Sequence, residues 1–150
     1  MKGKIMINKF DGQYDFLSNF YETKILYNGL TYENAEAAFQ AQKTLDIEEQ
    51  KSFTNIPPNI AKRKGRKVQL RLDWELVKDK IMEEICFAKF NQNKELKEKL
   101  LNTNNEMLIE GNYWHDNYWG ICTCEKCQKE NKGKNGNHLG MILMKIRSEL

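Results

Sequence analysis

The sequence has 150 residues, of which 40% are hydrophobic and 30% are charged, a balance that favours a folded globular chain over a disordered one. Its 24 basic and 21 acidic side chains give a net charge of +3, which neither requires a nucleic-acid partner nor argues against a phosphorylated substrate. This length fits one domain with a sizeable core, so we expect a single domain over residues 1–150.

Two features of the sequence bear on the compartment. No apolar run reaches membrane-spanning length, and residues 1–9 lack the uninterrupted apolar core of a signal peptide. Three of the four cysteines lie in the run CTCEKC at residues 122–127, which favours reduced thiols or a metal over a secreted disulfide framework. We therefore expect a cytoplasmic protein with no membrane partner.

The N-terminal part of the chain predicts two short strands with a polar loop between them. Residues 5–10 alternate weakly, and residues 24–27 form the second predicted strand, which ends at the tight-turn signal Asn-Gly of residues 28–29. In the loop, Ser18 and Asn19 are flanked by aromatic residues. These two side chains either cap backbone groups and anchor the core, or form a polar notch that hydrogen-bonds a small ligand.

The segment TYENAEAAFQAQK, residues 31–43, predicts a helix that begins near Asn34, whose side chain accepts a hydrogen bond from an N–H of the first turn. Apolar residues cover most of its circumference, which predicts burial on several sides. Glu36, Gln40 and Lys43 follow at i, i+4 and i+7 and therefore line one edge of this helix. Because an unpaired buried charge is costly, that edge faces either solvent or a polar cavity, and in a cavity Glu36 is a candidate acid or base.

Positive charge is densest where a proline pair opens a predicted helix over residues 59–67. Its run AKRKGRK, residues 61–67, is either solvated surface or a patch that contacts phosphate. For a phosphate patch, Arg66 and Arg71 are the better anchors, because a guanidinium group binds phosphate through two parallel hydrogen bonds.

The second half of the chain predicts mostly helix. A long amphipathic helix begins after Asp73, its expected cap, and is followed by a short helix at 95–101, a buried strand at 107–109 and a terminal core helix at 137–149. The segment GNYWHDNYWG, residues 111–120, gathers four aromatic side chains around a histidine and an aspartate. It either closes the core or forms an aromatic platform for a flat heterocycle, with a carboxylate at its edge.

The cysteine run offers a possible metal site. Cys122, Cys124 and Cys127 supply three thiolates over six residues, and His115 or His138 is available as a fourth ligand for tetrahedral zinc. The alternative is three reduced thiols in a surface loop. A catalytic zinc needs an open position near the substrate, so we assign no metal ligand and no cofactor to the reaction itself.

Taken in order, eight segments of the chain resemble the NADAR (YbiA-like) family. They are FLSNFY at 16–21, TYENAEAAFQAQK at 31–43, AKRKGRK at 61–67, RLDW at 71–74, AKF at 88–90, LIE at 108–110, DNYWG at 116–120 and GNHLGMILMKIR at 136–147. The resemblance covers nearly the whole chain and implies an α+β fold, a mostly helical single domain with a few short strands. The sequence departs from the family at Ala37, where a histidine is common, so any role of that histidine is absent. Two further departures bear on substrate choice: CTCEKC occurs in only part of the family, and the loop over residues 110–116 is longer than usual.

The resemblance also implies an activity, the hydrolysis of N-glycosidic bonds. Some members act on ribosylamino-pyrimidine phosphates of riboflavin biosynthesis, and others remove ADP-ribose from guanine bases of nucleic acid, so these are the expected partners. By position, Glu36 matches the central glutamate of the family, and Asp116 with Trp119 matches its aspartate and tryptophan near the substrate. Further pocket positions of the family are matched by Ser18, Asn19, Lys43 and Gly120.

The chemistry suits these residue types. Breaking a ribosyl C–N bond builds positive charge on the sugar, which Glu36 is expected to stabilise while it activates water. Asp116 is expected to orient the ribose hydroxyls or share proton transfer, and Trp119 to stack on the leaving base. Lys43 either contacts phosphate or forms an imine with ring-opened ribose, and Arg66 helps to hold a phosphate.

The alternative from another class is a non-catalytic module that binds ADP-ribose or nucleic acid. In that interpretation a zinc knuckle and the basic helix supply the contacts, and the aromatic side chains stack on bases. Release of free base from either expected substrate separates the enzyme from the module. The sequence does not indicate an oligomeric state.

Overall fold

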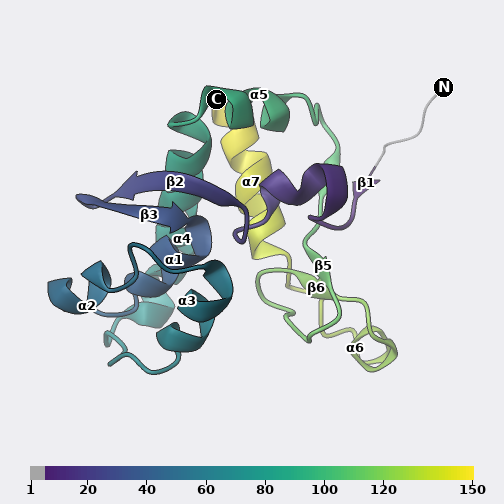
Figure 1. The fold of residues 1–150 in the computed structure, drawn as a ribbon. Helices are drawn as coiled ribbons and strands as arrows, with labels where there is room; N and C mark the ends of the chain where they lie inside the picture. Colours follow the sequence, from purple (N-terminus) through teal and green to yellow (C-terminus); the bar gives the residue numbers. More distant parts are fainter. Residues whose placement is uncertain (1–5) are drawn as a thin grey trace. The chain divides into compact units, whose positions relative to one another are not determined.

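The computed structural model describes residues 6–150, so the first residue of the predicted N-terminal strand lies outside the described part. The described chain is α+β, with helices as its main elements and short strands that form three pairs (Figure 1), which confirms the predicted fold class. Within residues 6–150, no helix has both the length and the apolar character that a membrane span needs.

The chain divides into two compact units, which are described separately. The α1 unit comprises residues 19–96, and the α7 unit comprises the residues up to 18 together with residues 97–150. Helix α5 (Lys94–Leu101) spans the second boundary in the sequence. The single domain over residues 1–150 stays a prediction.

The α1 unit is built around helix α1 (Ala35–Ala41). Strands β2 (Glu22–Tyr27) and β3 (Leu30–Asn34) form an antiparallel hairpin whose turn residues Asn28 and Gly29 have positive φ, as the Asn-Gly signal predicts. Helix α1 contacts this hairpin, helix α3 (Pro58–Gly65) and helix α4 (Trp74–Asn91), while the short α2 (Ile47–Lys51) covers one end (Figure 1). Strand β3 was not predicted, because no turn signal separates it from the helix that follows.

The expected N-cap of α1 is confirmed. The Asn34 side chain accepts a hydrogen bond of 2.7 Å from the backbone N–H of Ala37, and its own amide donates to the backbone carbonyl of Ile56. Ala37, Ala38 and Ala41 are fully buried, so α1 packs on several sides as predicted. The cap and the buried alanine face together fix the direction in which the polar edge of α1 points.

The expected cap of α4 is wrong. Asp73 precedes the helix but makes no side-chain capping bond. Its carboxylate instead accepts two hydrogen bonds from the Arg71 guanidinium, at 2.6 and 3.0 Å. A charge-assisted pair with a planar guanidinium is stronger than a hydrogen bond to a neutral backbone N–H, which explains why Asp73 pairs with Arg71 and does not cap the helix.

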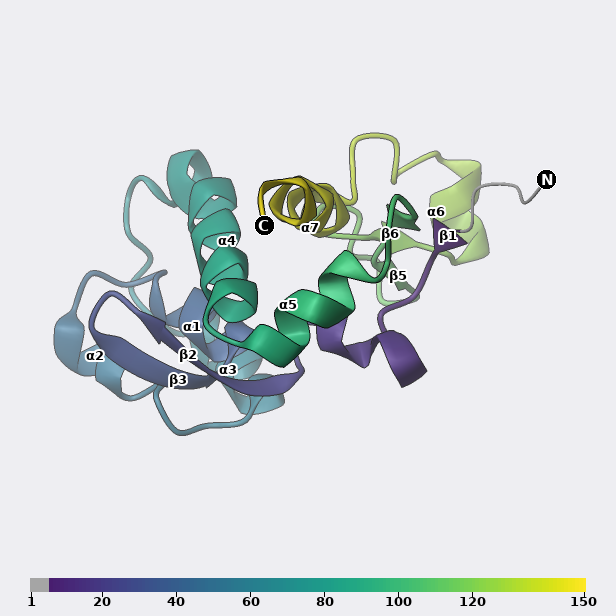
Figure 2. The same cartoon turned by 90° about the horizontal axis from the view of Figure 1, so that it is seen from above.

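The α7 unit is assembled from very short strands and one long helix. Strand β1 (Met6–Ile7) pairs in parallel with β4 (Met107–Leu108), and β5 (Gly111–Asn112) pairs in parallel with β6 (Ile121–Cys122). Strand β1 is followed in the chain by the 3-10 helix η1 (Gly12–Leu17), and β6 is followed by α6 (Glu125–Lys129). Figures 1 and 2 both show α6 beside the β5–β6 pair.

Helix α7 (His138–Glu149) supplies the core of this unit. Its residues Leu139, Leu143 and Ile146 are buried, in agreement with the predicted terminal core helix. It packs on β4 so closely at Gly140 that a side chain there would overlap the backbone carbonyl of Leu108. The helix start is therefore fixed against the end of β4.

Candidate active site

Glu36 lies in the first turn of α1 and is half-buried. Its backbone N–H donates to the backbone carbonyl of Asn19 at 3.0 Å, and its carboxylate accepts a hydrogen bond of 2.7 Å from the Gln40 amide. The i, i+4 spacing on the helix brings these two side chains together. The carboxylate is thus held in one direction.

Gln40 is itself fixed by close packing. It is buried, and because the carboxylate of Glu36 can only accept, the amide must turn its NH2 group toward that residue. The opposite amide oxygen lies against Gly65 of α3, where any side chain would overlap it. A glycine on α3 therefore makes room for the residue that orients Glu36.

Lys43 follows α1 and lies in a partly apolar, positively charged environment. Its ammonium nitrogen is 5.9 Å from the ring centre of Trp74, which packs in turn on Phe39. Burial lowers the pKa of Lys43 below its ordinary value, and the Glu36 carboxylate raises it. The two charged side chains of the predicted edge, Glu36 and Lys43, thus influence one another electrostatically.

Three further positive charges act on Lys43. Arg66, Lys62 and Lys78 each lower its pKa through charge repulsion. Lys62 lies in α3, Arg66 is the C-cap of that helix and Lys78 lies in α4, so a basic region surrounds Lys43, just beyond the C-terminal end of α1. Arg71, the other predicted phosphate anchor, uses its guanidinium on Asp73.

Ser18 and Asn19 follow the 3-10 helix η1. Ser18 is half-buried and its N–H donates to the backbone carbonyl of Asp15, which ends η1. The Asn19 side chain is buried against α4: it donates to the Met82 sulfur at 3.3 Å and accepts a long contact of 3.8 Å from the Cys86 thiol. Asn19 reaches Glu36 through its backbone carbonyl, which accepts the N–H of that residue.

In the α7 unit, Asp116 forms the centre of a tight loop. One of its carboxylate oxygens accepts the backbone N–H groups of Tyr118 and Trp119, at 3.0 and 2.9 Å. The Asn112 side chain holds the backbone of Asp116 from both sides, since it accepts from the N–H and donates to the carbonyl. One carboxylate oxygen is therefore fixed, and the other remains available as an acceptor.

Trp119 is half-buried in a small aromatic cluster. Its ring meets the Tyr118 ring edge-on at 4.8 Å and the His138 ring edge-on at 6.2 Å, while Tyr118 and His138 stack at 4.0 Å. The backbone carbonyl of Trp119 accepts the N–H of Leu139. The start of α7 thus holds the aromatic loop in place through the ring contacts of His138 and the backbone hydrogen bond of Leu139.

Gly120 is buried where two backbone segments cross. A side chain at this position would overlap the backbone carbonyl of Glu110. Its own carbonyl accepts the N–H of Asn137, whose side chain also bonds to the backbone of Glu110 and Leu108. Gly120 therefore contributes close backbone packing rather than a functional group.

Sequence reasoning did not include two residues that hold the site side chains in place. Gln40 was predicted to share the polar edge but was not counted as a site residue; its position four residues after Glu36 is the signal. Asn112 carries no such signal, because its contacts to Asp116 depend on the path of the loop.

Comparison with known proteins decides the family. The pattern of the NADAR domain family matches residues 7–150 of the chain. The chain belongs to the NADAR domain family. This confirms the resemblance seen in the sequence, and the match extends across nearly all of the residues described above.

Several known proteins are similar to the chain, two of them over most of their own length. The N-glycosidase YbiA of Escherichia coli is 36% identical over 140 residues, which cover 91% of this chain and 82% of the relative. An N-glycosidase of Nostoc punctiforme is 34% identical over 143 residues, which cover 91% of this chain and 86% of the relative. A riboflavin biosynthesis protein of Vibrio vulnificus is 33% identical over 143 residues, 93% of this chain but 36% of that longer protein.

A solved structure confirms the NADAR fold. The NMR structure of Escherichia coli YbiA matches with a TM-score of 0.82 and 34% identity, over 99% of this chain and 86% of that one. The mostly helical α+β architecture with short strands is therefore shared.

Proposed function

We propose that this NADAR protein hydrolyses the ribosyl C–N bond of a phosphorylated, nucleotide-like N-glycoside, with Glu36 as the carboxylate that acts on the sugar. The enzyme class is that of an N-glycosidase, as the similar proteins of Escherichia coli and Nostoc punctiforme are named. The observation that supports the assignment of Glu36 most directly is its fixed carboxylate beside Lys43 in a basic region.

The reaction needs a negative charge close to the anomeric carbon. As the C–N bond lengthens, positive charge develops on the ribose ring, and a preorganised carboxylate stabilises that charge without having to reorient. Gln40 supplies the preorganisation for Glu36 through its 2.7 Å hydrogen bond. The same carboxylate then takes a proton from the group that attacks C1′, and the departing base carries a proton away.

Two roles for Lys43 follow from its chemistry, and its environment favours one of them. A phosphate contact needs the charged ammonium, whereas an imine needs the neutral amine. Burial and three neighbouring cations lower its pKa, which increases the neutral fraction. We therefore propose that the neutral Lys43 amine attacks C1′ and gives its proton to Glu36 as the base departs with a proton of its own. Opening of the ribose ring then gives an imine between Lys43 and C1′, and water hydrolyses this imine to the free sugar and the amine.

The roles of Asp116 and Trp119 are carried over from the family resemblance. A carboxylate with one oxygen held by two backbone N–H groups is suited to accept hydrogen bonds from ribose hydroxyls, which supports orientation over proton transfer. The half-buried indole of Trp119 is suited to stack on a flat base. The backbone carbonyl of Asn19 helps to position Glu36 by accepting its N–H, and Gly120 allows close backbone packing against Glu110. Ser18 precedes Asn19 in the chain.

The basic region supports a phosphorylated substrate. Arg66 is exposed and carries a guanidinium that can grip a phosphate through two hydrogen bonds. Two substrates share this chemistry: ADP-ribose attached to guanine of nucleic acid, and a ribosylamino-pyrimidine 5′-phosphate. The name of the riboflavin biosynthesis relative supports the second, and the run of positive charge at residues 61–67 supports a polyanionic partner.

The decisive experiment offers both substrates to the same preparation. Purified protein is incubated with ADP-ribosylated guanine DNA and, separately, with a ribosylamino-pyrimidine 5′-phosphate, and the released base and sugar are quantified by liquid chromatography and mass spectrometry. We expect release from at least one substrate, and the faster one identifies the substrate class. Reduction with cyanoborohydride during turnover is expected to trap a sugar adduct on the wild type and not on Lys43→Arg.

Binding of both substrates without release of either base would contradict the proposal and favour a non-catalytic module. Release without a trapped adduct would assign Lys43 to phosphate contact. Comparing Glu33→Gln with Glu36→Gln controls for the loss of a negative charge in this segment, since Glu33 is exposed on β3.

A further inference from the structure

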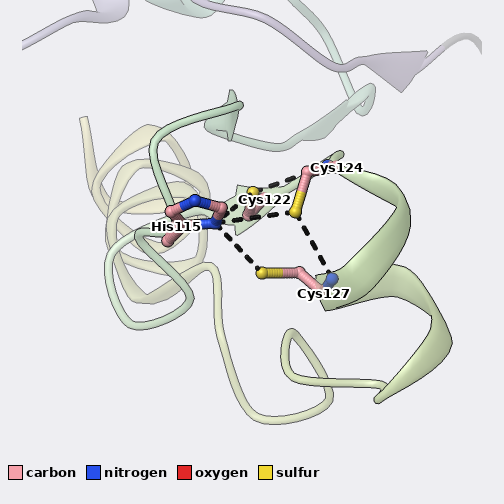
Figure 3. A group of neighbouring side chains, drawn as sticks. All are labelled: His115, Cys122, Cys124 and Cys127. Carbon is pink, nitrogen blue, oxygen red and sulfur yellow. Dashed lines mark hydrogen bonds between the residues drawn. The ribbon is translucent and has the colours of Figure 1, made fainter.

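Three thiols and one imidazole converge in the α7 unit. Cys122, Cys124, Cys127 and His115 each direct one donor atom toward a common centre, and these four atoms all lie within 4.8 Å of one another (Figure 3). Of the two histidines that the sequence offered, the structure brings His115 to the thiols. His138 instead stacks on Tyr118.

The distances from the imidazole nitrogen to the three sulfur atoms match a tetrahedral metal centre. The His115 Nδ1 atom lies 3.7, 3.5 and 3.5 Å from the sulfur atoms of Cys122, Cys124 and Cys127. Zinc–sulfur bonds of about 2.3 Å and zinc–nitrogen bonds of about 2.0–2.1 Å at tetrahedral angles place sulfur and nitrogen about 3.6 Å apart. The three observed separations agree with that value.

Hydrogen bonding alone does not account for the arrangement. One imidazole nitrogen is either a single donor or a single acceptor, so it cannot satisfy three sulfur atoms at once. A disulfide would join two of the sulfur atoms at about 2.05 Å and leave the third without a role, whereas all three cysteines are free thiols. A cation at the centre engages all four donor atoms together.

The surrounding backbone is arranged as a thiolate site requires. The N–H of Cys124 donates to the Cys122 sulfur at 3.5 Å, and the N–H of Cys127 donates to the Cys124 sulfur at 3.4 Å. The Asn117 amide donates to the Cys127 sulfur at 3.3 Å. Donors aimed at each sulfur stabilise its negative form and hold its direction, as partners of metal ligands do.

Local structure explains why these four positions meet. Cys122 ends β6, Cys124 caps the N-terminus of α6, and Cys127 lies one turn into that helix. His115 has a positive φ of 69°, which turns the chain sharply before Asp116. The turn returns the imidazole toward the thiols of the following strand and helix.

We propose that His115, Cys122, Cys124 and Cys127 bind one structural zinc ion. Three thiolates and one imidazole select zinc over the hard cations, and four protein ligands leave no open position, which is the mark of a structural site. The ion ties together a segment of the chain, residues 115–127, that also contains Asp116, Trp119 and Gly120. The proposal does not depend on the proposed activity.

Metal content is the first test. The full chain is purified under reducing conditions without chelator, and zinc and iron are measured by inductively coupled plasma mass spectrometry. We expect one zinc per chain in the wild type and in Cys86→Ala, which removes the thiol outside the cluster, and loss of the zinc in Cys124→Ser. Wild-type protein without zinc, or equal loss in Cys86→Ala, would overturn the proposal.

Cobalt substitution covers the case in which Cys124→Ser does not fold. Reduced, metal-free wild type titrated with Co²⁺ is expected to show the thiolate charge-transfer and visible bands of a tetrahedral site, saturating at one equivalent. His115→Cys keeps four ligands, so it is expected to retain tetrahedral bands at shifted positions. No bands in the wild type, or an identical spectrum for His115→Cys, would contradict the assigned ligands.

Discussion

At the scale of single residues, the carboxylate of Glu36 is fixed by neighbours that precede and follow it in the chain. The Asn19 carbonyl accepts its backbone N–H, and Gln40 donates to its side chain. A carboxylate held in this way is poised for one substrate position and does not have to lose rotamer freedom during the reaction. The same argument distinguishes Glu36 from an ordinary solvated glutamate.

Lys43 gives a pH dependence whose sign follows from its environment. Burial lowers its native pKa below the ordinary 10.5. Between the two values the unfolded chain binds more protons than the native chain, so the free energy of unfolding rises with pH in that window. We expect the wild type to gain stability relative to Lys43→Met as pH rises from 7 to about 10, measured by urea unfolding.

The control for that measurement is Lys24→Met, which removes an exposed lysine on β2 and changes the net charge equally. If both variants show the same trend relative to the wild type, the loss of charge alone explains it, and the burial of Lys43 is not the cause.

At the scale of elements, the contact between α1 and α3 helps to fix the position of the Glu36 carboxylate. Gly65→Ala places a methyl group onto the Gln40 amide oxygen. Alanine normally stabilises a helix by about 1 kcal/mol relative to glycine. A loss of stability in Gly65→Ala would therefore indicate overlap with Gln40 and not a change in helix propensity. We expect a loss of about 1–3 kcal/mol in the free energy of unfolding, from overpacking, together with slower turnover.

The second variant in this comparison is Gly65→Ala in the Gln40→Ala background, where the overlapping amide is gone. There the alanine is expected to be tolerated or stabilising in thermal and urea unfolding. Additive losses in the double variant would show that Gly65 and Gln40 do not interact, and would remove the link between α3 and Glu36.

The elements with strong periodicity or a specific cap could be predicted from the sequence. Helix α1 begins after Asn34 and α7 has its core face where expected, because capping and helical spacing are local properties. The cap at Asp73 failed because a nearby arginine, Arg71, competes for the carboxylate. Two-residue strands such as β5 and β6 are too short to show alternation, and they form only because the chain brings them together.

At the scale of the whole molecule, a net charge of +3 conceals an uneven distribution. The basic region around α1 should matter for phosphorylated substrates. We expect Arg66→Ala to raise the KM for the active substrate several-fold with little change in kcat, measured by steady-state kinetics. Arg63→Ala, from the same positive run, is the matched control, and an equal effect of both variants would indicate general attraction rather than a phosphate contact at Arg66.

The candidate site was predictable only in part. Residues close together in the sequence can be grouped from their spacing, whereas residues far apart in the sequence meet only through the path of the folded chain. Glu36 and Gln40 share an edge of α1, so the sequence alone groups them, whereas Lys43 was predicted on the same helix but lies two residues beyond its end. The ordered segments of the family resemblance supplied Asp116 and Trp119, whose assignment stays a prediction. The choice of His115 over His138 beside the cysteines depends on a sharp turn and on the start of α7, which no spacing rule indicates.

The most direct test of the central claim is the rate of base release by Glu36→Gln. Glutamine keeps an oxygen that can accept the hydrogen bond from Gln40, so the melting temperature should change little while the negative charge is lost. We predict a rate at least about 100-fold below that of the wild type on the active substrate, with Glu33→Gln close to the wild type. Near-normal release of base by Glu36→Gln on every substrate that the wild type cleaves would contradict the account.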